Sequence, residues 1–359
     1  CFGNSLGFKF ADNLTANEIF GYCYGGFLLE VTENIADAAE IGEITADGKI
    51  SYNGEEIGLE RLLGIYENKL ESVYRCNKQN PNTEMQTFSY TAENRVSPAV
   101  KTAKPKVLIP VFPGTNCEYD SAKAMRDAGA EPEIFVINNR SAENVAKSVE
   151  DFANSLKTAQ MVFIPGGFSG GDEPDGSGKF ITAFFRNAAV KEQVTDLLDN
   201  RDGLMCGICN GFQALIKLGL VPYGKIIDTD ENCPTLTYNT IARHQSKIVR
   251  TRIASNKSPW LADTEVGDIY SVPISHGEGR FIASDELILR LAENGQIATQ
   301  YVDEKGEAAS DIHFNPNGSY YAIEGITSPD GRVFGKMGHA ERIGDNLYKN
   351  VIGEYDMQL

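Results

Sequence analysis

Short apolar runs alternate with helical patterns between Pro105 and Leu218, and this alternation constrains the fold more than any other feature of the sequence. The apolar runs cover residues 106–112, 133–137, 161–164 and 203–208. Helical patterns follow at residues 121–128, 144–156, 179–198 and 211–218. Strands that alternate with helices form a parallel sheet whose faces are covered by the helices. We therefore predict an α/β fold, a parallel sheet flanked by helices, with ligands bound beyond the carboxyl ends of the strands.

The pattern differs in the segments that precede this region. Residues 1–76 predict a partial α+β segment, with a strand-like run at 26–31 and a helix over 59–70. A short strand at 49–52 between the turn signals Asp47-Gly48 and Asn53-Gly54 predicts a hairpin. Residues 77–104 are rich in Asn, Gln, Thr, Ser and Lys and lack apolar periodicity, which is typical of a linker. The main domain is then 105–359, with further strands expected near 269–274, 296–302 and 333–337.

Charge and cysteine content exclude several classes of protein. The formal net charge of −17 disfavours nucleic acid and anionic membranes as partners, because phosphate binding depends on Lys and Arg. The opening residues contain neither a membrane-spanning apolar run nor the pattern of a signal peptide. The seven cysteines are irregularly spaced, which favours a reducing cytoplasm over a disulfide framework.

Cys209 is the first candidate catalytic residue. It stands at the centre of Gly-Ile-Cys-Asn-Gly, residues 207–211, where a predicted strand ends and a helix begins. Small residues on both sides permit the sharp turn of a nucleophile elbow. The helix N-terminus favours the reactive thiolate, and the N–H of Asn210 faces a developing oxyanion. We therefore expect Cys209 to act as a nucleophile.

The other cysteines have weaker claims to chemistry. Cys206 and Cys209 form a Cys-x-x-Cys pair, as redox sites do, but Cys206 falls inside an apolar run and is expected to be buried. No second Cys or His pair lies at ligand spacing, so no metal site is expected. We predict that Cys117, Cys206 and Cys233 are core residues.

A cysteine nucleophile needs a base, and the chain has four histidines. His339 follows the strand expected at 333–337, and Glu341 lies two residues later. If the strand extends this far, the two side chains face the same way. Glu341 can therefore orient the imidazole while its other nitrogen takes the thiol proton. His276, in the polar loop 275–280, is a second candidate for the site.

A glycine-rich loop, residues 165–172, follows the third predicted strand. It lacks the Lys-Ser/Thr of a phosphate-binding loop and the spacing of a dinucleotide fingerprint. Its strand should neighbour the strand that ends at Cys209. The loop therefore suits a backbone donor to an oxyanion.

These residues and their order resemble the class I (triad) glutamine amidotransferases. More narrowly, the motifs at 112–118, 166–169, 209–213 and 275–280 resemble the formylglycinamidine ribonucleotide synthases of purine biosynthesis. Residues 1–76 are similar to the end of the ATP-dependent synthetase region of a large single-chain form. The opening Cys1 fits a chain cut from a longer or processed product.

The resemblance implies a reaction. Cys209 would attack the side-chain amide of glutamine, release ammonia and form a glutamyl thioester that water hydrolyses. His339, oriented by Glu341, would move the protons. The glutaminase needs no cofactor, whereas ATP and Mg²⁺ belong to the complete synthase. The partner is the remainder of the synthetase.

It also implies binding residues. The N–H groups of Gly167 and Asn210 would hold the oxyanion, and Gln213 matches a position that contacts glutamine. The chain departs from the family pattern at Gly338 and Ala340, where prolines are frequent, and at His244, where an aromatic residue is more common. His244 is then either structural or part of the lip of the site.

Two other functions remain open from the sequence. One is a different cysteine hydrolase on the same fold, such as a peptidase. The other is a docking domain whose glutaminase is silent without its synthetase partner, to which the acidic surface is suited.

Overall fold

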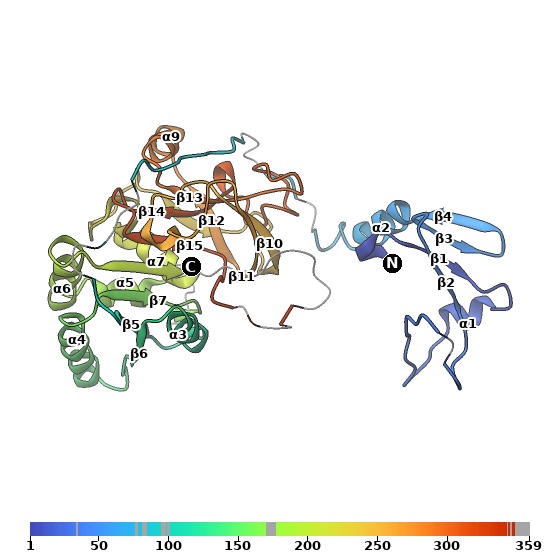
Figure 1. Cartoon of the computed structure of the whole chain (residues 1–359), viewed down its shortest axis with the longest axis horizontal. Coiled ribbons are helices and arrows are strands. Elements are labelled where there is room, and N and C mark those ends of the chain that lie inside the picture. Colours follow the sequence, from blue (N-terminus) through green and yellow to red (C-terminus); the bar gives the residue numbers. More distant parts are fainter. Residues whose placement is uncertain are drawn as a thin grey trace. The chain divides into compact units, whose positions relative to one another are not determined.

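The computed structural model describes residues 1–33, 35–75, 78–80, 85–94, 98, 101–169, 177–342, 344 and 347–348. The chain divides into two compact units, Cys1–Asn77 and Lys78–Leu359, each of which is described by itself (Figure 1). Three parts of the sequence predictions lie outside the described residues: Cys76, the last three residues of the glycine-rich loop (170–172), and much of the predicted linker.

The first unit is a small sheet with short helices. Its strands are β1 (Gly7–Phe10), β2 (Gly42–Thr45), β3 (Lys49–Tyr52) and β4 (Glu55–Gly58), in the order β2-β1-β3-β4. The 3₁₀ turn η1 (Phe2–Asn4) and the helices α1 (Ala16–Phe20) and α2 (Leu59–Asn68) complete it. The predicted hairpin is confirmed, because Asn53 and Gly54 both take the positive φ of a tight turn between β3 and β4.

The strand predicted at residues 26–31 is wrong. This stretch joins no sheet of the described chain, and Phe27 and Leu28 are 91% and 79% exposed. Apolar, β-branched sequence favours a strand only where another strand is available to pair with its backbone.

Nine strands of the described second unit form one sheet, in the order β11-β10-β13-β14-β15-β8-β7-β5-β6. The last five are mutually parallel: β15 (Val333–Lys336), β8 (Leu204–Ile208), β7 (Met161–Ile164), β5 (Lys106–Val111) and β6 (Glu131–Val136). The other four continue the sheet antiparallel: β14 (Ile323–Thr327), β13 (Ile297–Tyr301), β10 (Gln245–Ile253) and β11 (Ile269–His276). A separate ribbon pairs β9 (Thr235–Tyr238) with β12 (Glu278–Ile282).

Helices connect the parallel strands as the alternation predicts (Figure 1). They are α3 (Glu118–Asp127), α4 (Ala142–Leu156), α5 (Lys179–Phe185) and α6 (Ala188–Asp199). The helices α7 (Asn210–Leu218) and α8 (Leu220–Tyr223) follow β8, and α9 (Asp285–Glu293) lies between β12 and β13, with 3₁₀ turns at η3 (Pro259–Leu261) and η4 (Tyr320–Ala322). The single helix predicted over 179–198 is two helices, because the Asn187 side chain accepts a hydrogen bond from Ala189 N and caps a new one. No described helix is both long and apolar enough to cross a lipid bilayer.

The predicted α/β fold with parallel strands is therefore confirmed, and the strands expected near 269–274, 296–302 and 333–337 are present. The long antiparallel strand β10 was not anticipated. Only Ile248, Val249 and Ile253 of its nine residues are apolar, and the other six are basic or polar, so the strand signal in the sequence is weak.

Part of the polar stretch 77–104 belongs to the second unit and packs against its core. Phe88 is 6% exposed and belongs to the hydrophobic core, and its N–H donates to Gln300 Oε1 at 2.8 Å. Tyr90 N donates to Ala254 O at 2.8 Å. Phe88 and Tyr90 therefore attach this polar segment to the core. Two isolated aromatic residues produce no periodic apolar pattern, so the sequence did not predict this packing.

Candidate active site

Three neighbouring strands deliver the candidate site residues to one edge of the sheet. β8 pairs in parallel with β7 on one side and with β15 on the other. Gly167 follows β7, Cys209 follows β8 and His339 follows β15, so all three lie beyond carboxyl ends of adjacent strands. The expected neighbourhood of the glycine-rich loop and the Cys209 strand is confirmed.

Cys209 occupies a strained elbow. Its φ and ψ of 52° and −106° lie outside the regions that residues with a side chain prefer, and it is the N-cap of α7. The two flanking glycines are needed, since a Cβ on Gly207 would come 2.7 Å from Gly211 and a Cβ on Gly211 would come 2.1 Å from Ile164 O. Cys209 N is held by Lys336 O at 2.9 Å.

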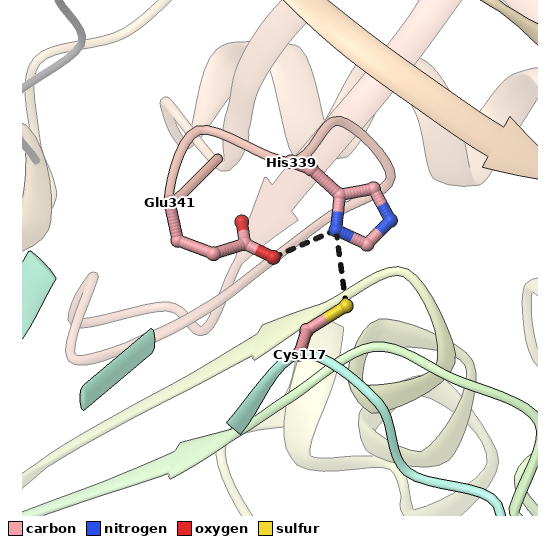
Figure 2. A group of neighbouring side chains, drawn as sticks. All are labelled: Cys117, His339 and Glu341. Atoms are coloured by element: carbon pink, nitrogen blue, oxygen red, sulfur yellow. Dashed lines mark hydrogen bonds and ion pairs between the residues drawn. The ribbon is translucent and has the colours of Figure 1, made fainter. Parts of the chain in front are cut away.

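His339 and Glu341 form a buried pair (Figure 2). His339 Nδ1 lies 2.7 Å from Glu341 Oε1, and the two side chains are 3% and 2% exposed. Burial by itself would lower the pKa of His339. The Glu341 charge and hydrogen bonds with Cys117, Cys209 and Glu341 outweigh burial and raise that pKa well above its ordinary value. The arrangement therefore favours an imidazolium beside the thiols.

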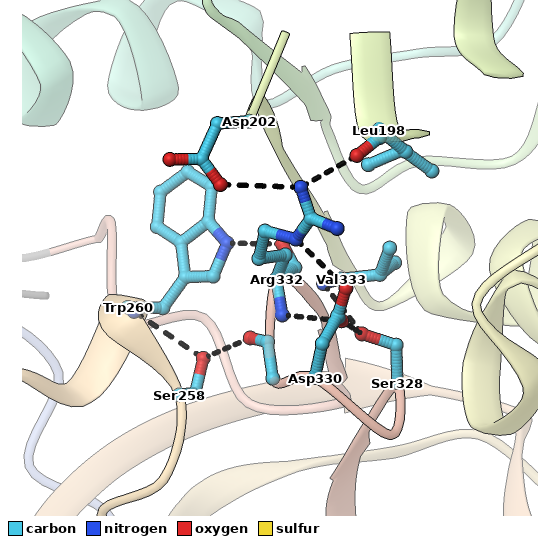
Figure 3. A network of polar contacts seen from close by, with 9 residues as sticks. Leu198, Asp202, Ser258, Trp260, Ser328, Asp330, Arg332 and Val333 are labelled. Carbon is cyan, nitrogen blue, oxygen red and sulfur yellow. Dashed lines mark hydrogen bonds and ion pairs between the residues drawn. The ribbon is translucent and has the colours of Figure 1, made fainter. Parts of the chain in front are cut away.

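The opposite end of β15 is anchored by a polar network (Figure 3). The Arg332 guanidinium donates to Asp330 at 2.7 Å and to Asp202 at 3.3 Å. Val333 N donates to Ser328 Oγ at 2.9 Å. These bonds fix where β15 begins, and a strand of fixed register in turn determines where His339 emerges.

Cys117 joins this group although the sequence marked it only as a core residue. It is 1% exposed, as predicted, but its sulfur lies 3.8 Å from His339 Nδ1 and donates to Asn116 Oδ1 at 2.9 Å. It is the N-cap of α3, in the connection that follows β5. Cys206 is also buried, and burial raises its pKa far above the ordinary range, so it stays a thiol. Cys233 is only partly buried, unlike the prediction.

The backbone of Gly166 separates the three reactive side chains. A Cβ at this position would lie 2.6 Å from His339 Cε1, 3.3 Å from Cys117 Sγ and 3.4 Å from Cys209 Cβ. A hydrogen is therefore the only substituent that fits between the imidazole and the two cysteines.

Gly167 and Asn210, the expected oxyanion donors, are held close together. Gly167 has a φ of 138° and is bridged to Thr115. The Asn210 side chain accepts from Ser169 N at 3.2 Å, which ties the glycine-rich loop to the start of α7. The tie brings the backbone of the loop to the nucleophile elbow.

A cavity of about 300 Å³ opens beside Cys209. Four further positions singled out in the sequence, Gly167, Gln213, His244 and His276, line it. This volume is at the lower end of the range for small-molecule sites. The wall also contains four polar residues that were not among the predicted site residues, Ser177, Tyr238, Arg243 and Glu278.

The Gln213 side chain is already engaged within the protein. Its amide oxygen accepts from Asn210 Nδ2 at 3.0 Å, and its amide nitrogen donates to Glu278 O. The Glu278 carboxylate accepts from both the N–H and the hydroxyl of Ser177. Gln213 therefore shapes the wall of the cavity through this network.

His276 is 2% exposed, and neither of its ring nitrogens has a partner in the described chain. Burial, followed by the charges of His339 and His244, lowers the pKa of His276 to about 3, so the ring is neutral near pH 7. His244 Nε2 lies 3.0 Å from Ser275 Oγ, and its ring is 6.2 Å from that of Phe168. His244 is thus part of the cavity wall, as the second of its two interpretations supposed.

Comparison with known proteins decides the family. The family model described as "CobB/CobQ-like glutamine amidotransferase domain" matches residues 104–358. The chain belongs to this family. The amidotransferase is 37% identical over 257 residues to "Phosphoribosylformylglycinamidine synthase subunit PurQ" of Methanococcus maripaludis strain C7, covering 71% of this chain and 87% of the relative.

Two further relatives agree. The subunit of the same name from Aquifex aeolicus is 32% identical over 253 residues, covering 70% of the amidotransferase and 95% of the relative. A chain of the solved "PurLQS from Thermotoga maritima" is 26% identical with a TM-score of 0.51, covering 71% of this chain and 94% of that chain. The class I amidotransferase fold expected from the sequence is confirmed.

Two of the site residues that the sequence analysis did not predict lie in recognisable sequence patterns. Cys117 lies in the motif at 112–118, directly after the first parallel strand, where ligand-binding residues are expected. Glu278 lies two residues after His276, within the loop already marked as a candidate. Ser177 follows a stretch outside the described residues, and no pattern identified it.

Proposed function

We propose that this amidotransferase hydrolyses glutamine to glutamate and ammonia, and that the ammonia converts formylglycinamide ribonucleotide to formylglycinamidine ribonucleotide in purine biosynthesis. The observation that carries the first part is Cys209, held at a strained elbow beside a cavity and hydrogen-bonded with a buried His339–Glu341 pair. The names of the relatives, subunits of phosphoribosylformylglycinamidine synthase, support the second part.

The proposed reaction begins with the Cys209 thiolate, which attacks the side-chain carbonyl of glutamine. The carbonyl π electrons move to oxygen, and the N–H groups of Gly167 and Asn210 stabilise that oxyanion. His339 donates a proton to the leaving nitrogen, so ammonia departs and a glutamyl thioester remains. His339 then takes a proton from water, which attacks the thioester and frees glutamate and Cys209. Glu341 keeps the imidazole oriented and stabilises its charged form.

The proposal assigns the ammonia acceptor site to a synthetase partner. ATP and Mg²⁺ belong there, and no step above passes through them. The six described cysteines are free thiols, which suits a reducing compartment such as the cytoplasm.

Glutamate release from glutamine by the purified chain tests the proposal, together with a mass spectrum after treatment with diazo-oxo-norleucine, a glutamine analogue that alkylates nucleophiles. We expect one adduct, mapped to Cys209 and absent from Cys209→Ala. An adduct without turnover would mean that the glutamine site waits for its partner. Turnover of a peptide but not of glutamine, or an adduct elsewhere, would refute the assignment.

Substitution of Gly166 by alanine is expected to reduce glutamine turnover by about 100-fold or more, because a displacement near 1 Å in a catalytic group has an effect of that order. The added methyl meets His339 Cε1 at 2.6 Å and must displace the imidazole. Gly64→Ala is the matched control, since a Cβ there has no neighbour within 4 Å. Wild-type kinetics from Gly166→Ala would show that the imidazole position is not critical.

A further inference from the structure

Two segments that are far apart in the sequence bring three metal-binding side chains together at the site (Figure 2). Cys117, His339 and Glu341 each offer one donor atom, and within the described chain these atoms lie within 4.8 Å of one another. His339 Nδ1 is the centre of the set, 2.7 Å from Glu341 Oε1 and 3.8 Å from Cys117 Sγ. A sulfur, an imidazole nitrogen and a carboxylate oxygen are the three donor types that zinc takes from proteins.

Two of the three donor separations are close to those of a zinc site. With Zn–N and Zn–O near 2.0 Å and Zn–S near 2.3 Å, tetrahedral geometry places N and O about 3.3 Å apart and N and S about 3.5 Å apart. The Nδ1–Oε1 separation would widen and the Nδ1–Sγ separation would shorten, each by roughly 0.6 Å or less. Side-chain rotation alone supplies movements of that size.

The second oxygen of the Glu341 carboxylate lacks a hydrogen-bond partner among the described residues. Glu341 Oε2 is buried without a hydrogen-bond partner in the described chain, and the Glu341 side chain is 2% exposed. A buried carboxylate oxygen without a donor is costly, and a cation bound to the same carboxylate would offset its charge. The mechanism above uses only the other oxygen of Glu341, and it does not use Cys117.

We propose that Cys117, His339 and Glu341 bind one Zn²⁺ ion, and that the bound ion blocks glutamine hydrolysis. Zn²⁺ would replace two protons, that of the Cys117 thiol and that shared by His339 Nδ1 and Glu341 Oε1, and both would leave to solvent. The fourth position of the ion remains open to water. With Nδ1 and the carboxylate bound to the metal, His339 loses its orienting partner. The inhibition of glutamine hydrolysis rests on the proposed function, whereas Zn²⁺ binding does not.

Cobalt(II) is the probe for the site, because it replaces zinc and a thiolate–cobalt bond absorbs in the near ultraviolet. Metal-free full-length chain is titrated with Co²⁺ and then with Zn²⁺. We expect the thiolate band together with the intense visible bands of tetrahedral cobalt, both bleached by one equivalent of Zn²⁺. Cobalt bound to exposed cysteines absorbs equally in all variants. The difference in absorbance between variants therefore reports the metal bound at this site.

The variants separate this site from the nucleophile. Cys117→Ser and Glu341→Gln should each weaken Zn²⁺ binding by about tenfold or more, since even an indirect supporting contact contributes that much to metal affinity. Cys209→Ala and Cys206→Ser should keep it. Bands that persist in Cys117→Ser, or disappear in Cys209→Ala, would overturn the proposal, as would their absence from the wild-type chain. If Cys117→Ser does not fold, loss of metal binding in Glu341→Gln tests the site instead.

Enzyme kinetics test whether the bound Zn²⁺ ion blocks glutamine hydrolysis. Zn²⁺ should inhibit glutamate release by the wild-type chain, a chelator should reverse the inhibition, and Cys117→Ser should need about tenfold more Zn²⁺ or greater for the same effect. Equal sensitivity of the two proteins would refute inhibition through Cys117. A chain that binds the metal at this site, but neither turns over glutamine nor forms an adduct with diazo-oxo-norleucine, would leave the binding established and contradict the proposed function instead.

Discussion

Replacement of Cys209 by alanine will abolish glutamate release from glutamine, with a fall in rate of about 10⁴-fold or more. Without the sulfur no thioester forms, and the oxyanion donors and His339 have no covalent intermediate to act on. The protein should still fold, because Cys209 is a small side chain at a turn and alanine removes one atom. Glutamate formation at saturating glutamine measures the effect, and thermal unfolding of the variant checks its integrity.

Cys206→Ala is the matched control for this prediction. Cys206 lies three residues earlier, is 1% exposed, and has a thiol whose pKa is raised far above the ordinary range by burial. Its removal leaves a small cavity, with a stability cost of about 1–2 kcal/mol, and should preserve most of the turnover. Equal loss of activity in the two variants would restore a redox or metal role for the Cys-x-x-Cys pair.

The second large effect is expected at the base. His339→Ala should lower turnover by roughly 10²–10⁴-fold, the range that positioned proton transfer contributes. Glu341→Ala should have a smaller effect, because an orienting carboxylate acts only through the imidazole. The comparison of the two rate losses at one pH tests the assignment, and equal losses would count against it.

A pH profile separates the orienting role of Glu341 from a merely structural one. Its charge raises the pKa of His339, so its removal lowers that pKa. If the active form is a thiolate–imidazolium pair, His339 then loses its proton at lower pH. The alkaline limb of kcat/KM should move to lower pH in Glu341→Ala, whereas damage to folding would reduce the rate at every pH alike. An unmoved limb would contradict this role.

Much of the architecture followed from local pattern. Apolar runs and helical periodicity predicted the strands β5, β7 and β8 and the helices between them, because those signals are carried by consecutive residues. The same was true of the Asn53-Gly54 hairpin. The prediction failed where the outcome depended on partners: residues 26–31 have strand composition but no neighbouring strand, and Asn187 divides a continuous helical pattern by capping a new helix.

The sequence by itself determined the turn at Cys209, since two glycines and a strand–helix junction specify the elbow locally. It also determined the His339–Glu341 pair, whose members are two residues apart. Only the tertiary structure decided that Cys117 lies against an imidazole 222 residues away, and that His276 is buried with a neutral ring. Such contacts arise from the order of strands in the sheet, and strand order is set by packing over the whole chain, which no short segment encodes.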